Sequence, residues 1–91
     1  MYLWKLSVIK PDSSAWEASI FRGTLVVRAE SEEDARLQAT NEFGIAVKHQ
    51  IGRDVIFPPW EQSDVVACKP YIETGGITKD GARAVVQKIS L

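Results

Sequence analysis

The sequence predicts an α+β fold: a single, mostly antiparallel sheet of about four strands with one helix packed on one face, in the chain order β-β-α-β-β. Three observations indicate this fold. Residues 2–10 and 20–29 alternate between two faces, residues 31–44 carry signals for a helix and its ends, and two further strand-like segments follow. The 91 residues, 45% hydrophobic and 25% charged, are expected to form a single α+β domain over residues 1–91 with one thin core.

The first strand is predicted at residues 2–10, where every second side chain faces the core. This set is Tyr2, Trp4, Leu6 and Val8. Pro11 ends the strand, because proline cannot donate to a strand ladder. The second strand is predicted at residues 20–29, and its core-facing set is Phe21, Gly23, Leu25, Val27 and Ala29. The connection between the strands is too short for a crossover, so they are expected to pair antiparallel.

The helix is predicted to begin after Ser31, whose hydroxyl suits an N-cap. Acidic residues fill the first turn, where they face the positive end of the helix dipole, and Asp34 takes the place of a capping-box acid. The apolar stripe expected to face the sheet is Ala35, Ala39 and Phe43. Gly44 is expected to end the helix in the left-handed conformation.

The C-terminal half is predicted to add two strands. Residues 45–60 are harder to assign: Ala46, Val47 and Ile51 fit either a short strand or an additional turn of helix, residues 52–54 fit a turn, and residues 58–59 fit an extended stretch. The third strand is expected at residues 64–72, where Pro70 indicates a sheet edge or a bulge. The fourth is expected at residues 82–91, and its adjacent valines fit either face, so the sequence does not determine its register.

No catalytic residue, metal site or cofactor is predicted. His49 and Cys68 are the only histidine and cysteine, and neither stands at a zinc-binding spacing. Cys68 is expected to be a small buried apolar residue, and His49 a surface residue. Helix capping explains the acidic residues at 30–34, and the glycine pair at 75–76 predicts a turn, not a phosphate loop. These features favour a protein that is not an enzyme.

With the third strand taken from Val65, basic residues are concentrated in the predicted strands, whereas acidic residues lie on the helix and loops. Five basic side chains are predicted to share the sheet face opposite the core, provided that Lys88 shares a face with Val86: Lys5, Arg22, Arg28, Lys69 and Lys88. One interpretation is a solvated face whose lysines prevent edge-to-edge aggregation. The other is a binding patch for nucleic acid or an anionic ligand, although that face lacks aromatic side chains on which bases could stack.

Two tryptophans fall in predicted loops. Trp16 and Trp60 are interpreted either as lids that complete the burial of a small core or as interface aromatics, a residue type enriched at binding hot spots.

The junction between the second strand and the helix has a recognisable pattern, V-R-A-x-S-E-x-x-A-R, at residues 27–36. With Trp60 and Cys68 further on, it resembles the hairpin–helix–hairpin of small, uncharacterised bacterial and phage-associated proteins. The elements shared with these proteins span about two thirds of the chain. Residues Lys69 and Pro70 depart from it, since acidic residues stand there in the pattern. The resemblance implies a fold and no activity.

The leading hypothesis is a non-enzymatic binding domain that contacts another protein, or a second copy of itself as a homodimer through an exposed strand. The alternative is binding of nucleic acid or an anionic ligand on the basic face. The net charge of −1 gives no overall attraction to nucleic acid or membranes. No apolar segment is long enough to cross a bilayer, and one cysteine fits a reducing compartment, so a cytoplasmic protein without a membrane partner is expected.

Overall fold

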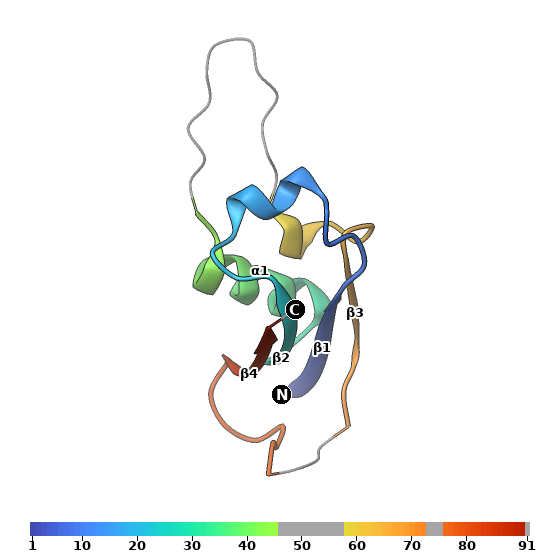
Figure 1. The fold of residues 1–91 in the computed structure, drawn as a ribbon. Coiled ribbons are helices and arrows are strands. Elements are labelled where there is room, and N and C mark those ends of the chain that lie inside the picture. The colour runs from blue at the N-terminus through green and yellow to red at the C-terminus, as the bar shows by residue number, and fades with distance from the viewer. Residues whose placement is uncertain (46–57, 73–75, 91) are drawn as a thin grey trace.

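A computed structural model of the chain describes residues 1–45, 58–72 and 76–90. The strands are β1 (Tyr2–Val8), β2 (Gly23–Ala29), β3 (Val66–Pro70) and β4 (Ala84–Ser90), and the α-helix is α1 (Glu32–Phe43). Two short 3-10 helices, η1 (Ser14–Ala18) and η2 (Pro59–Glu61), lie in the connections. The strands form one antiparallel sheet in the order β3-β1-β2-β4, and α1 packs on one face of it (Figure 1). The predicted α+β fold and chain order are confirmed.

The core lies between α1 and the central strands. Leu6, Leu25 and Val27 are fully buried on the face toward α1, where they meet the predicted helix stripe of Ala35, Ala39 and Phe43. Tyr2 is the exception in the predicted core set, since it lies at the end of β1 and is 62% exposed. Apart from Tyr2, the alternation in β1 and β2 therefore predicts correctly which side chains face the core.

The start of α1 follows the predicted capping pattern. The Asp34 N–H donates to Ser31 Oγ over 3.1 Å, and Asp34 Oδ2 accepts from the Glu30 N–H over 3.1 Å. The prediction for Gly44 is wrong, because this residue has an extended backbone with φ −67°. Gly44 forms a β-bridge with Ser19, and a Cβ on it would collide with the Thr40 carbonyl oxygen. Glycine is needed here for close approach, not for a left-handed turn.

The C-terminal strands are shorter than predicted. Pro70 ends β3 at one sheet edge, as its inability to donate to the ladder requires. Of the ambiguous segment 45–60, the described part ends in η2, and residues 46–57 lie outside the described residues. Among the described helices, none is long and apolar enough to cross a membrane.

Candidate functional site

The predicted basic patch does not assemble as a group of five. Lys5 and Lys69 do lie together, since they are directly opposite each other in the β1–β3 ladder and both are exposed. Arg22 lies before β2 and donates to the Pro11 carbonyl oxygen over 2.9 Å. Two like charges directly opposite each other repel, so this pair alone is a weak basis for a site.

Arg28 lies on the same sheet face as Lys5 but serves the fold. Its Nε donates to the Thr78 carbonyl oxygen over 3.0 Å, and its guanidinium also donates to the Ala82 carbonyl oxygen over 3.1 Å. The segment before β4 is thereby held against this face. Leu3, also on this face, is only 3% exposed. The face is therefore partly covered and less open than the sequence predicted.

Lys88 lies on the opposite face from the one predicted. Lys88 is opposite Leu25 and Val85 is opposite Val27, so the ladder contains a β-bulge between these pairs. Leu25 and Val27 both face α1, and Lys88 therefore does too. Its Nζ lies 5.8 Å from the centroid of the Phe21 ring and 5.7 Å from that of Phe43, within range of a cation–π contact. The predicted grouping of Lys88 with Lys5 is wrong, because the bulge reverses the alternation of β4.

The two loop tryptophans are buried, with 8% of Trp16 and none of Trp60 exposed. Their rings meet edge to face at 5.1 Å, and Trp60 stacks on Phe21 at 6.3 Å. Both indole N–H groups are satisfied, by the Lys10 carbonyl oxygen at 2.9 Å and by Ser19 Oγ at 3.1 Å. The tryptophans complete the core, in agreement with the first of the two interpretations. They are not available as exposed interface aromatics.

Cys68 is half-buried on the face toward α1 and packs against the core. Burial raises the pKa of its thiol to about 11, and the nearby Glu32 carboxylate adds to the rise. The thiol is therefore protonated at neutral pH and a poor nucleophile. His49 lies outside the described residues. Within the described ranges, no group of histidine, cysteine or acidic side chains is arranged to hold a metal ion.

The two edges of the sheet differ in how they are protected. On β3, Pro70 lacks an N–H, and the buried Arg36 donates to the Val66 carbonyl oxygen over 2.9 Å and to that of Trp60 over 3.1 Å. β4 is longer, contains no proline and carries one charge, Lys88. Among the described residues, β4 pairs with β2 alone. Its outer backbone groups are therefore open to an added strand.

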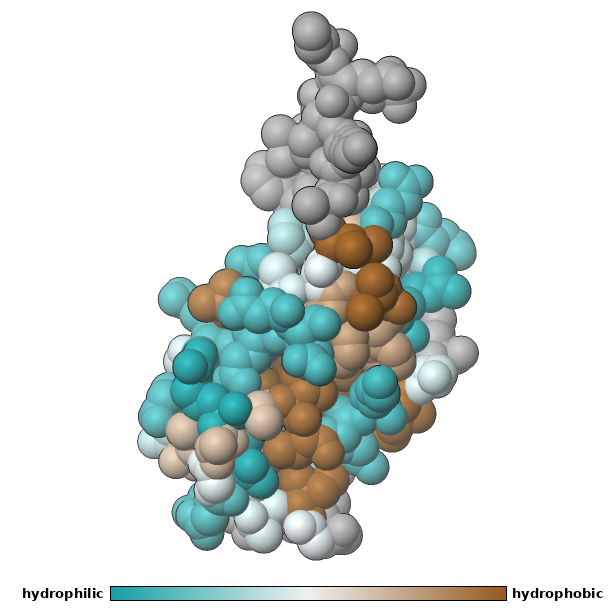
Figure 2. Space-filling model, turned by 90° about the vertical axis from the view of Figure 1, so that its left-hand side faces the viewer, coloured by the Kyte–Doolittle hydropathy of each residue, from teal (hydrophilic) through white to brown (hydrophobic). Residues whose placement is uncertain are grey.

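Apolar surface adjoins the open edge of β4. Figure 2 shows the side on which β4 lies in Figure 1, with a hydrophobic band between hydrophilic areas. A hollow of about 260 Å³ is lined by Glu42, Phe43 and the β4 residues 85–88. Ile20 and Ile89 are 69% and 55% exposed. An open edge beside apolar side chains can hold an extended peptide through its backbone and its side chains.

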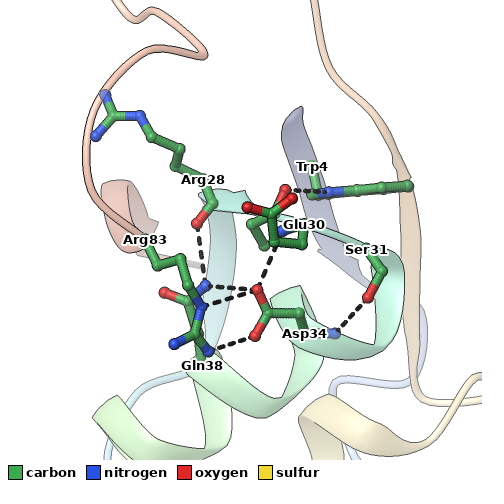
Figure 3. A network of polar contacts seen from close by, with 8 residues as sticks. Trp4, Arg28, Glu30, Ser31, Asp34, Gln38 and Arg83 are labelled. Carbon is green, nitrogen blue, oxygen red and sulfur yellow. Dashed lines mark hydrogen bonds and ion pairs between the residues drawn. The ribbon is translucent and has the colours of Figure 1, made fainter. Parts of the chain in front are cut away.

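A polar network fixes the segment that leads into β4 (Figure 3). Arg83 donates to both carboxylate oxygens of Asp34, and the Gln38 amide bridges from Asp34 to the Arg28 carbonyl oxygen over 3.4 and 3.0 Å. The hydrogen bond from Arg83 lowers the pKa of the Asp34 carboxyl. The network ties the beginning of β4 to the first turns of α1, so the open edge is held on a rigid support.

Sequence reasoning did not single out β4 as a site. Its composition gave a signal, because a strand of seven residues with one charge and no proline lacks most of the usual edge protection. That signal has meaning only once the strand order is known, since a central strand has the same composition. Comparison with known proteins finds no matching family model, no similar curated protein and no similar solved structure. The resemblance to small bacterial and phage-associated proteins stays a prediction.

Proposed function

We propose that this chain is a non-enzymatic binding domain that contacts other proteins through the open edge of β4. The observation that supports this most is the contrast between the two sheet edges. β3 ends at Pro70, and its Val66 carbonyl oxygen accepts a hydrogen bond from Arg36. In contrast, β4 pairs with β2 alone among the described residues. Strand addition at such an edge gains main-chain hydrogen bonds, and the apolar side chains beside it provide selectivity.

The half-buried, protonated Cys68 thiol is consistent with a function other than catalysis. We also propose that the protein is cytoplasmic, since a single cysteine suits a reducing compartment.

Binding of nucleic acid or an anionic ligand on the basic face has less support. Of the five basic side chains, Lys88 faces α1, and Arg28 is held by two carbonyl oxygens. Only Lys5 and Lys69 form an exposed pair opposite each other. Nucleic-acid binding is therefore included as an outcome of the test.

The test is a selection of displayed extended peptides on the whole chain. The double variant Val86→Lys and Ile89→Lys places charges along β4, and Ala67→Lys makes a matched change on β3. We expect the selected peptides to bind the double variant at least about tenfold more weakly and to bind Ala67→Lys unchanged. Equal binding to all three proteins would place the interaction elsewhere. Peptide binding by none of them, with nucleic-acid affinity that falls steeply as salt rises, would support the basic face instead.

A further inference from the structure

We infer that the partner on the β4 edge is a second copy of this chain, paired antiparallel through β4 so that two four-stranded sheets join. This inference rests on the proposed function and specifies its partner. It is carried by the β-bulge in β4 and by the charges beside it.

The bulge restricts how β4 can pair with itself. Val85 and Lys88 face α1, whereas Ala84, Gln87 and Ile89 face the other side, as their partners on β2 require. Residues opposite each other in an antiparallel pair share a face. In most of the registers that pair five or more residues of each strand, residues from different faces stand opposite each other. In one of the other registers, the two Lys88 side chains stand opposite each other.

The remaining register satisfies both faces. Val85 of one copy lies opposite Lys88 of the second, Ala84 lies opposite Ile89, and Val86 lies opposite Gln87. On the face away from α1, the exposed Ile89 is then covered by a small side chain. The same contacts occur twice about the two-fold axis, as a symmetric dimer interface requires.

The charges on the α1 face are complementary in this register. Glu42 lines both hollows that contain Val85, of about 430 and 260 Å³. Lys88 of the second copy, opposite Val85, therefore arrives beside the Glu42 carboxylate. Among the described residues of one copy, Lys88 forms a cation–π contact but no ion pair. Pairing of two copies thus gives each lysine an acidic partner.

The experiment is sedimentation equilibrium of the whole chain across a wide concentration range. We expect a concentration-dependent dimer that Lys88→Glu and Glu42→Lys each weaken at least about tenfold. The double variant exchanges the two charges and is expected to restore the dimer, which a general loss of folding would not do. Lys69→Glu on β3 is the matched control and should leave the dimer unchanged. Circular dichroism identifies any variant that does not fold, and Lys88→Gln then replaces Lys88→Glu.

A chain that stays monomeric throughout, a dimer that Lys88→Glu leaves unchanged, or a weakened dimer that the charge exchange does not restore would overturn the inference. The proposed function fails separately. A monomer that binds displayed peptides at β4 keeps that function and rejects only the second copy as the partner. A monomer that binds no peptide at β4 contradicts both.

Discussion

Lys88 stands directly opposite Leu25 in the β2–β4 ladder, and this places a lysine on the buried-core face of the sheet. One additional residue in β4 causes the placement, because a bulge changes which side chains face the helix. The lysine then covers two aromatic rings at the rim of the core. In the proposed dimer, the same bulge excludes most registers, and the repulsion between two Lys88 side chains excludes one more.

Replacing Arg36 with methionine is expected to lower the free energy of unfolding by about 2–3 kcal/mol, since two buried carbonyl oxygens lose their donor. Those carbonyls belong to Trp60 and Val66. Urea denaturation measures the change. Arg22→Met, at an exposed arginine that donates to one carbonyl oxygen, is the control and is expected to cost less than about 0.5 kcal/mol. Equal effects from the two substitutions would contradict the structural role of Arg36.

Replacing Trp60 with alanine is expected to cost about 3–5 kcal/mol, because the fully buried ring packs against Trp16, Phe21 and Phe43. Thermal or urea denaturation checks the value. Trp60→Phe keeps most of the packing and loses the hydrogen bond to Ser19, so a smaller loss is expected. A Trp60→Ala protein as stable as the wild type would show that this ring is a surface group.

The sequence predicted the sheet, the helix and most of the core face, because alternation and capping are local signals. Ser31 and Asp34 are the best example, since the cap they form depends on a few neighbouring residues. The candidate site was harder to predict from the sequence than the fold. The positions of Lys88 and Trp16 depend on a bulge and on contacts between distant loops. Strand order, which makes β4 an edge, arises only from the assembled sheet.

Asp34 is expected to make stability depend on pH in the acid range. The hydrogen bond from Arg83 lowers the folded-state pKa of this carboxyl. The contribution of the ionised Asp34 carboxylate to folding stability is therefore fully present above the unfolded-state pKa of about 3.9. It is lost as pH falls through the lower folded-state pKa. Asp34→Asn should be less stable than the wild type at neutral pH and equally stable in strong acid, as measured by urea denaturation.

The control for Asp34 is Asp12→Asn, a substitution at an exposed carboxyl that should leave neutral-pH stability unchanged. A difference between Asp34→Asn and the wild type that stays constant at all pH values would contradict the role of the ionised carboxylate.

Cys68 is expected to react slowly with iodoacetamide at neutral pH, because a thiol with a pKa of about 11 is almost entirely protonated there. The rate should rise about tenfold per pH unit through the mildly alkaline range, following the thiolate fraction. Labelling in denaturant should be fast and serves as the control. Rapid labelling of the folded protein at neutral pH would show an activated thiol and would reopen a catalytic role.

Backbone amide exchange, followed residue by residue by NMR at low and high protein concentration, most directly tests whether two copies of the chain pair through β4. We expect amides within residues 84–89 to become protected as concentration rises, while those of β3 at Val66–Pro70 do not change. Protection that develops on β3, or no concentration-dependent change along β4, would contradict the pairing of two copies through β4.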